Sequence, residues 1–398
     1  MSKILIWNKN LPLKNAGGPA GYLYNIHSYL KEHPVDEISF YSDVKGGDEY
    51  IVERGLKRKL KDIIAGCLGS LLYVKHLFSQ LTRNNELSNE EIEILKTFNY
   101  VHFHTFVDAR LYLKSIRKNV PNIKVILTTH TPEPYCDEYC GTFGISWILK
   151  IPGIRNKCIR KETQCIHDVD YLMFPVPQVK EVYVSKSSLY EKALKEADYK
   201  TFYVPTAIID VVNSNNEGYL ESKIKDDSLR VCYVGRHCAV KGYDFLKAIA
   251  NEAFSINLDV TFIIGGSQNG IPKLDDNRWI ELGWVNTVNL LREIDVFVLP
   301  NQQTYYDLIL LEVIRSGKPV LLTSTGGNKY FKKYQSPGMF YCDYGNVKQA
   351  CEQLKKLINF KKQGRLSALG KENRNLFEKI STLPVYVERY LSEIRKLS

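Results

Sequence analysis

One carboxylate, that of Glu312, stands in a predicted helix that is otherwise apolar. The helix is expected over 307–316 and follows an apolar run at 295–299 that has the character of a buried strand. Burying a carboxylate costs free energy unless a partner binds it. We therefore expect Glu312 to bind a ligand that carries hydroxyl groups, such as a sugar.

Two cations, Arg236 and Lys241, lie in the loop 235–242 directly after a predicted strand. Two cations in such a loop suit a diphosphate, and arginine can bind phosphate oxygens in bidentate geometry. Each charge-assisted contact contributes about 1.5–3 kcal/mol. The alternative is a solvated loop that binds no ligand. The position of the loop 235–242 between strand and helix, with glycine at both ends, favours phosphate binding.

Another glycine-rich loop, 15–21, follows the first predicted strand and contains Gly17 and Gly18. Glycines let backbone amides approach a ligand, and the helix that follows favours an anion at its N-terminus. The loop lacks the GxGxxG pattern, and the second strand ends at Tyr41 without an acidic residue, which disfavours a nicotinamide-dependent dehydrogenase. A tight turn between strand and helix also needs glycine, so this loop is ambiguous by itself.

Apolar strands alternate with helices through both halves of the chain. The predicted strands are 4–7, 37–41, 100–104, 124–130, 171–174, 230–234, 260–265, 279–282, 295–299, 320–322 and 339–341. The predicted helices are 21–31, 109–118, 243–252, 288–293, 307–316 and 347–357. Strands this apolar, separated by helices, indicate an α/β fold whose parallel sheets are covered on both faces.

The length of 398 residues favours two domains, with a boundary in the polar segment 213–228. We expect a Rossmann-like domain over 1–205, a second over 206–375, and a helix at 376–398 that returns to the first domain. Two doubly wound domains place the loops at the carboxyl ends of their strands across a shared cleft, which is the favoured ligand position.

Composition describes an ordinary soluble protein, with 44% hydrophobic and 25% charged residues. The formal charge of +10 suits anionic ligands or acidic lipid surfaces, but no nucleic-acid-binding motif occurs, so nucleic acid is disfavoured. The nine cysteines lack zinc-site spacing even at Cys136 and Cys140, and no metal is expected. A signal-peptide pattern is missing and the longest apolar run, 63–74, is too short to span a bilayer, which favours a cytosolic location.

Two segments of the first half, 54–83 and 147–161, combine basic and apolar residues. A basic flank beside an apolar run suits a helix that lies on an anionic membrane, at about 1 kcal/mol per basic residue near the surface. The alternative is a solvated basic helix that packs through its leucines. The second segment favours the membrane interpretation, which an acceptor on a lipid carrier would require.

Three lesser candidates have simpler explanations. Asp168 and Asp170 form a DxD pattern, here expected to be turn chemistry rather than a metal site. His102 and His104 share one face of a strand, where core or cleft-lining positions are favoured over a metal pair. Glu133 lies in a proline-flanked loop that either lines the acceptor side or is only a stiff connection.

Three motifs recur in the order seen in the retaining glycosyltransferases of family 4, particularly those of bacterial polysaccharide and lipid-linked glycan assembly. They are Gly-Arg-x5-Gly at 235–242 with its lysine, Gly-Trp-Val at 283–285, and the segment 300–319. Thr-Thr-His at 128–130 also resembles the strand-end histidine of the family. The resemblance covers nearly the whole chain and implies the GT-B fold, a nucleotide-sugar donor and transfer with retention and without a metal.

Roles follow from the resemblance position by position. It implies that Arg236 and Lys241 hold the donor diphosphate and that Glu312 binds the ribose hydroxyls. It implies that His130 contacts the transferred sugar near the reaction centre. The remaining donor-binding positions that it implies are Gly17, Gly18, Gly283, Trp284, Val285, Thr304, Asp307 and Leu308.

The chain departs from the family pattern at two of these positions. Thr304 stands where the family usually has the first glutamate of its Glu-x7-Glu motif, and Asp307 replaces a frequent glycine. Threonine is shorter and uncharged, so it could bind a sugar hydroxyl only weakly or through water. The enzyme uses an unusual donor sugar, Asp307 takes over the role of the acid, or activity is lost; Thr304 could also be a loop residue that binds no ligand.

We expect a cytoplasmic glycosyltransferase, peripheral on the inner face of the cell membrane, that extends a glycan held on a lipid. Its donor would carry UDP, GDP or dTDP, and no other cofactor is expected. One alternative is a non-catalytic GT-B subunit that supports a partner enzyme. Another is a sugar phosphorylase or nucleotide-sugar epimerase on the same fold.

Overall fold

The computed structural model describes residues 2–9, 18–46, 56–131, 133–210, 220, 227–266 and 271–397, without the side chains of residues 19 and 56–68. These residues form two compact units. The first comprises Met1–Pro175, Lys180–Val204 and Glu388–Ser398, and the second comprises Val176–Val179 and Pro205–Val387. Most of the polar segment 213–228 lies outside the described residues.

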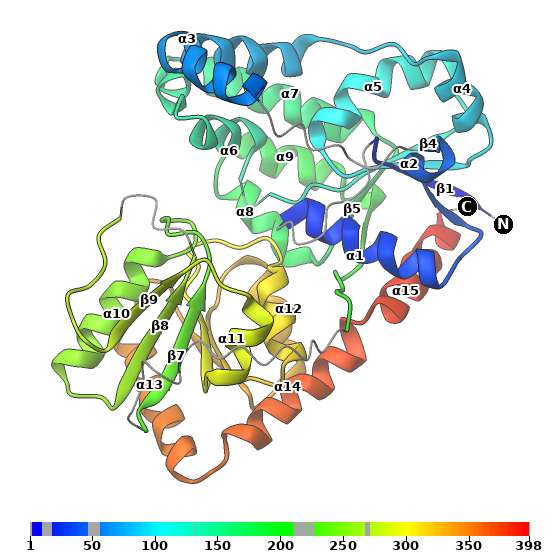
Figure 1. Cartoon of the computed structure of the whole chain (residues 1–398). Coiled ribbons are helices and arrows are strands. Elements are labelled where there is room, and N and C mark those ends of the chain that lie inside the picture. Colours follow the sequence, from blue (N-terminus) through cyan, green and yellow to red (C-terminus); the bar gives the residue numbers. More distant parts are fainter. Residues whose placement is uncertain are drawn as a thin grey trace. The chain divides into compact units, whose positions relative to one another are not determined.

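The first unit contains a parallel sheet whose strands lie in the order β2-β1-β3-β4-β5-β6. Figure 1 labels β1, β4 and β5 of this sheet. The strands are β1 (Ile4–Trp7), β2 (Ile38–Phe40), β3 (Tyr100–Phe103), β4 (Lys124–Leu127), β5 (Tyr171–Phe174) and β6 (Thr201–Tyr203). Every residue of β1 and β3 is buried, as required of a parallel sheet with helices on both faces. The strand order reverses between β1 and β3.

Helices make up the rest of the first unit. They are α1 (Gly18–Glu32), α2 (Tyr41–Val44), α3 (Leu56–Thr82), α4 (Asn89–Lys96), α5 (Phe106–Asn119), α6 (Tyr135–Thr142), η1 (Ser146–Lys150), α7 (Ile154–Asp168), α8 (Glu181–Val184), α9 (Ser188–Glu196) and η3 (Asp198–Lys200). The short η2 (Pro177–Lys180) stands where the chain passes between the units. The final helix, α15 (Leu383–Lys396), contributes its last two turns, where the Tyr390 hydroxyl bonds His102 Nδ1 at 2.8 Å.

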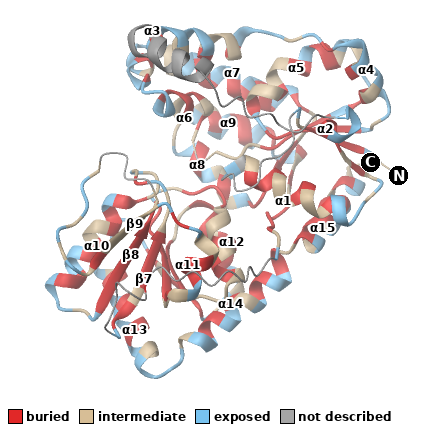
Figure 2. Ribbon diagram, viewed as in Figure 1, coloured by how far each residue is buried: buried red, intermediate tan, exposed pale blue. Residues whose placement is uncertain are grey.

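The second unit repeats this plan, with strands in the order β12-β11-β10-β7-β8-β9. The strands are β7 (Leu229–Val234), β8 (Val260–Gly265), β9 (Trp279–Gly283), β10 (Val296–Leu299), β11 (Val320–Thr323) and β12 (Met339–Cys342). The helices are α10 (Tyr243–Ser255), α11 (Thr287–Glu293), α12 (Leu308–Arg315), η4 (Gly326–Tyr334), α13 (Val347–Lys362) and α14 (Leu366–Ile380). Its strands are mainly buried, as the red arrows of Figure 2 show.

The predicted α/β class, with a doubly wound parallel sheet in each half, is confirmed. All predicted strands occur within a few residues of their expected ends. The predictions lacked β6, which has only three residues, and the helices α4, α6, α7, α9 and α14. The many cations of α7 lie beside buried cysteines and isoleucines, and this mixture hid its helical period.

Candidate functional site

The strand order of the second unit reverses between β7 and β10, which pair in parallel. In open parallel sheets the loops that follow two such strands diverge and leave room for a ligand. The loop after β7 carries Arg236 and Lys241, and the loop after β10 leads into α12 with Glu312. The fold therefore brings these predicted donor-binding segments to one edge of one sheet.

Lys241 and Asp307 connect these two loops. Lys241 Nζ lies 2.8 Å from Asp307 Oδ1, and the Asn301 side-chain amide donates to Asp307 Oδ2 at 2.6 Å. Both carboxylate oxygens of Asp307 are thus bonded within the protein. The carboxylate holds the lysine ammonium in place, and this makes Asp307 a positioning residue for Lys241.

Gly242 lets the Lys241 loop approach the end of β10. Its φ is +70°, and a Cβ placed there would lie 1.8 Å from the carbonyl oxygen of Pro300. Gly326 plays a similar part on the other side of the β10 loop, because its Cβ would lie 2.0 Å from the carbonyl oxygen of Thr304. No side chain fits at either position without moving the β10 loop.

Arg236 is exposed, in contrast to Lys241. The Tyr233 hydroxyl donates to the Arg236 carbonyl at 2.8 Å, which fixes the backbone of the loop. The guanidinium makes no hydrogen bond or ion pair with any described residue. An exposed arginine on a fixed backbone can turn toward an anionic ligand.

Glu312 is half-buried on α12, and its carboxylate makes no hydrogen bond to the described residues. Burial raises its pKa above the ordinary value, against the opposing charge of Arg315. A carboxylate in such a place is costly unless a ligand donates hydrogen bonds to it. The expectation that a ligand would satisfy Glu312 therefore fits the local structure.

Two further polar groups of the β10 loop have no hydrogen-bond partner among the described residues. They are Thr304 Oγ1 and Asn301 Oδ1, and both side chains are almost fully buried. An unpaired buried acceptor or hydroxyl costs about 1–3 kcal/mol, so these atoms also fit a ligand or an ordered water. Asn301 was missed in the sequence, although its place directly after a buried strand and a proline was an available signal.

Leu308 opens α12, and its N-cap residue Asp307 gives no side-chain hydrogen bond to the helix. The first amides of α12 therefore have no side-chain cap, and the helix dipole favours an anion beside them. The predicted role of Leu308 can rest on its backbone amide, since the first turn of a helix offers free N–H groups.

The predicted base-binding segment follows β9. Gly283 has a φ of +68°, and its carbonyl accepts from the Gly266 amide at 2.7 Å. Val285 is buried against Gly265, while the Trp284 side chain is 82% exposed. The segment therefore offers an exposed aromatic ring and a fixed turn at the carboxyl edge of the sheet.

His130 lies in the first unit, at the end of a row of histidines from adjacent strands. His130 Nε2 lies 3.0 Å from His104 Nδ1, and the rings of His104 and His102 lie 4.1 Å apart. His102 is anchored by Tyr390 and by Thr128 Oγ1, the latter at 2.8 Å. His102 and His104 therefore share one face of the strand, as expected, and His104 contacts His130.

These histidines are held neutral. Burial lowers the pKa of His102 and of His130 to about 3, and that of His104 falls well below its usual value. His104 Nε2 is buried without a partner among the described residues. An unpaired acceptor is tolerated better than an unpaired N–H. We therefore place the proton of His104 on Nδ1, where it donates to His130 Nε2, so that His130 carries its own proton on Nδ1.

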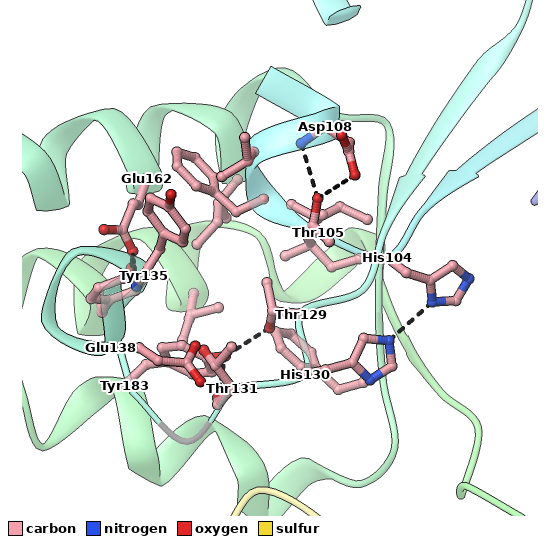
Figure 3. Close-up of a pocket in the computed structure, with 18 of the residues that line it drawn as sticks. His104, Thr105, Asp108, Thr129, His130, Thr131, Tyr135, Glu138, Glu162 and Tyr183 are labelled. Atoms are coloured by element: carbon pink, nitrogen blue, oxygen red, sulfur yellow. Dashed lines mark hydrogen bonds between the residues drawn. The ribbon is translucent and has the colours of Figure 1, made fainter. Parts of the chain in front are cut away.

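A cavity of about 430 Å³ lies beside His130 within the first unit (Figure 3). It is bounded by the ends of β4 and β5 and by residues of α5, α6, α7 and α9. Figure 3 shows the labelled polar side chains around its edge, with His104 and His130 at one side. Sequence reasoning missed this cavity apart from His104 and His130, since its walls come from segments far apart in the chain.

The remaining predicted positions vary in what they contact. Gly18 opens α1 with a φ of +61°, whereas Gly17 lies outside the described residues. Glu133 Oε1 lies 3.5 Å from Lys186 Nζ. Asp170 accepts from the Val125 amide at 2.7 Å and also pairs with Arg117, as expected of turn chemistry.

The segments predicted to face a membrane lie on α3, η1 and α7. Leu71 and Leu72 on α3 and Trp147 on η1 expose 63%, 53% and 47% of their area. The side chains of the most basic stretch, 56–68, are outside the described ones. Within the described residues, no helix is long and apolar enough to cross a bilayer, and no cluster of three metal-ligand side chains occurs.

Comparison with protein families gives one match. Residues 228–359 match the family model Glycosyl transferases group 1. This range contains Arg236, Lys241, Glu312 and the whole sheet of the second unit. The second unit therefore carries a glycosyltransferase group 1 domain.

Two curated proteins show more distant similarity. The chain is 24% identical over 270 residues to an uncharacterized 41.2 kDa protein in the cps region of Klebsiella pneumoniae, covering 62% of this chain and 68% of that protein. It is 29% identical over 169 residues to the Escherichia coli UDP-Gal:alpha-D-GlcNAc-diphosphoundecaprenol alpha-1,3-galactosyltransferase, covering 36% of this chain and 44% of that enzyme.

Solved structures share the fold over the full chain. Sucrose-phosphate synthase from Thermosynechococcus elongatus superimposes with a TM-score of 0.64 at 12% identity, covering 100% of this chain and 99% of that one. HepE of Anabaena, solved in complex with UDP, gives a TM-score of 0.62 at 11% identity, covering 99% and 100%. These likenesses confirm the expected GT-B fold with two Rossmann-like domains.

Proposed function

We propose that this protein is a retaining, metal-independent glycosyltransferase that moves a sugar from a nucleotide-sugar to a hydroxyl of a glycan acceptor. The donor would be linked to UDP, GDP or dTDP. The observation that carries the proposal is the half-buried, unpaired carboxylate of Glu312 at the same sheet edge as Arg236 and Lys241. All three residues lie within the glycosyltransferase group 1 domain.

Catalysis in this proposal depends on charge and placement. Arg236 and Lys241 bind the donor diphosphate and stabilise the negative charge that grows on it as the bond to the sugar breaks. The ribose hydroxyls donate to Glu312, which fixes the nucleotide. The neutral His130 contacts the transferred sugar, and a donor phosphate oxygen takes the proton of the acceptor hydroxyl.

The acceptor is proposed to be a glycan on a lipid carrier, as in polysaccharide, capsule or O-antigen assembly. Similarity to an enzyme named for a diphosphoundecaprenol acceptor supports this class. The exposed apolar side chains of α3 and η1 support attachment to an anionic membrane from its cytoplasmic side. The helices α3 and η1 belong to the first unit, where the acceptor side is expected.

A donor screen tests the proposal. The purified protein is incubated with UDP-, GDP- and dTDP-sugars, with and without EDTA, and release of nucleoside diphosphate is measured. We expect one donor to be hydrolysed slowly, independently of EDTA, and faster when its acceptor is present. NMR of the product should show the anomeric configuration of the donor. Inversion, or a strict need for metal, would contradict the proposed mechanism.

Thr304 favours one alternative, a non-catalytic GT-B subunit that supports a partner enzyme. Its hydroxyl lies buried where the family pattern has a glutamate. A scaffold of this kind should neither bind nucleoside diphosphates nor hydrolyse any nucleotide-sugar, so the same screen separates it from the enzyme. Phosphate-dependent sugar release, or epimerisation without acceptor, would instead reveal a phosphorylase or an epimerase.

A further inference from the structure

The cavity beside His130 is walled mainly by carbon atoms. Leu127, Leu172 and Phe174 form its floor on β4 and β5, and Ile166 and Leu194 face it from α7 and α9. Its volume of about 430 Å³ lies in the range of ligand-binding pockets, whereas packed interiors leave few voids larger than a water molecule. An apolar pocket of this size favours an apolar ligand, because such a ligand removes its carbon atoms from water.

Most polar groups on the cavity wall are bonded to one another. The Tyr183 hydroxyl lies 2.8 Å from Thr129 Oγ1 and 2.7 Å from the Thr131 carbonyl. The Glu162 carboxylate accepts from the first amides of α6, at 2.9 and 3.0 Å, and from the Tyr190 hydroxyl. With their polar atoms occupied, these side chains present carbon to the cavity, which disfavours a sugar as its occupant.

The charge of the wall excludes a phosphate. Among the described residues that line the cavity, the charged ones are Asp108, Glu138 and Glu162, and none is lysine or arginine. An anionic group would meet three carboxyl groups and no lysine or arginine among these lining residues, and burying it without a cation is unfavourable. The occupant is therefore apolar and uncharged.

A row of aromatic rings joins this cavity to the surface. Phe106 and Tyr135 on its wall lie 5.8 Å apart, and Tyr135 is followed at helical spacing by Tyr139 and Phe143 along α6. Phe143 stacks on Tyr73 of α3 at 4.4 Å.

The outer end of this row is exposed and apolar. Phe143 is itself exposed, Leu72 precedes Tyr73 on α3, and Trp147 follows on η1. Polar contacts also join α3 to α6 in the described part of the chain, among them His76 Nδ1 to the Tyr139 hydroxyl at 2.8 Å. Aromatic and apolar side chains therefore continue without interruption from the cavity wall to the surface proposed to face a membrane.

We propose that this cavity binds a hydrocarbon chain, namely the lipid portion of the acceptor, which enters along the seam between α3 and α6. The inference rests on the proposed function for the identity of the lipid, but the binding itself does not. It gives the first unit a means of selecting acceptors by their lipid and not by their sugar alone.

Calorimetric titration with farnesol, an uncharged isoprenoid alcohol, tests the proposal. We expect saturable binding to the wild type with a stoichiometry near one. Ile166→Trp and Leu194→Phe, which fill the cavity, should weaken it by about tenfold or more, since each displaces several methylene groups of the ligand. Lys195→Trp, at an exposed position of α9, the helix that carries Leu194, should bind farnesol like the wild type. Thermal melting of each variant checks that it is folded.

Two further titrations separate the outcomes. The proposal would be overturned if the wild type bound N-acetylglucosamine and the filled variants did not. It would also be overturned if the wild type showed no saturable farnesol binding. Unchanged farnesol binding in folded Ile166→Trp and Leu194→Phe would overturn it as well. Titration with UDP, GDP and dTDP reports on the second unit alone, so the loss of one binding activity without the other shows whether the cavity or the proposed function has failed.

Discussion

The ammonium of Lys241 lies 2.8 Å from the Asp307 carboxylate, and this pair joins the loop after β7 to the loop after β10. Asn301 occupies the second carboxylate oxygen. Asp307 stands where the family that the sequence resembles frequently has glycine. Its carboxylate holds the lysine that we expect to bind the donor diphosphate. A donor would meet a lysine that is already placed, which lowers the ordering cost of binding.

Replacing Asp307 by alanine should release Lys241 and weaken donor binding. Charged hydrogen bonds contribute about 1.5–3 kcal/mol, so kcat/KM for the nucleotide-sugar should fall by roughly 10- to 100-fold. Asp307→Asn, which keeps one acceptor oxygen, should be milder. The pair Asp244–Lys247 on α10, in which the aspartate is exposed, provides the control, and Asp244→Asn should change kcat/KM little. If Asp307→Asn and Asp244→Asn lowered kcat/KM equally, Asp307 would not be a positioning residue for Lys241.

Gly242→Ala should push the loop after β7 away from the loop after β10. The added Cβ would lie 1.8 Å from the Pro300 carbonyl oxygen, so the backbone must shift. We expect a loss of stability of about 2 kcal/mol or more in urea unfolding, together with loss of nucleotide binding. Gly345→Ala has a similar positive φ of +84° but meets no atom within 4 Å, and it should cost only about 1 kcal/mol. Similar losses in both variants would show that backbone strain alone is responsible.

Glu312→Gln should stabilise the protein at neutral pH while it weakens donor binding. Burial raises the pKa of Glu312, so the folded state binds its proton more tightly than the unfolded state does. Stability from this group is therefore full below its unfolded pKa and is lost as pH rises through the folded pKa. At pH 7 the glutamine variant should melt about 1–3 °C higher than the wild type in ligand-free protein.

The pH dependence of this difference in Tm shows whether it arises from the ionisation of Glu312 or from a general effect of the substitution. The difference in Tm between Glu312→Gln and the wild type should disappear as the pH is lowered to about 3, where the glutamate is protonated in both states. Glu352→Gln, at an exposed position on α13, should show no difference at either pH. A wild type that melts higher than Glu312→Gln at pH 7 without ligand would mean that the carboxylate has a favourable partner in the protein.

His130 should act as a neutral group across the working pH range. Burial lowers its pKa to about 3, so its charge does not change between pH 5.5 and 8. Any pH dependence of kcat/KM in that interval should persist in His130→Asn, even though this variant is slower. A limb near pH 6.5 that vanishes in His130→Asn would show that the histidine titrates during the reaction.

Much of the fold could be predicted because its strands are short, apolar and separated by clear helices. The predicted limits of β1, β5 and β8 agree with the structure to the residue. The positions of Arg236 and Lys241 after β7 followed from this strand pattern, since side chains at the carboxyl end of a parallel strand share one edge of the sheet.

Other parts of the site depend on tertiary contacts that no local pattern records. Asn301 matters because the Asp307 carboxylate folds back onto it. The burial of Thr304 depends on Gly326, twenty-two residues later in the printed sequence. The cavity beside His130 arises where α5, α6, α7 and α9 leave a space above β4 and β5, and each of its apolar residues would fit an ordinary core.

The central claim is that Lys241 and Glu312 bind the nucleotide of a sugar donor. Calorimetric titration of UDP, GDP and dTDP into the wild type, Lys241→Ala and Glu312→Ala tests it most directly, with Lys247→Ala on α10 as the control. We predict that the wild type and Lys247→Ala bind at least one of these nucleotides with similar affinity. The two site variants should bind it about tenfold more weakly or not at all, abolish sugar transfer and melt within a few degrees of the wild type. Undiminished binding and turnover in both site variants, or a wild type that binds none of the three nucleotides, would contradict the claim.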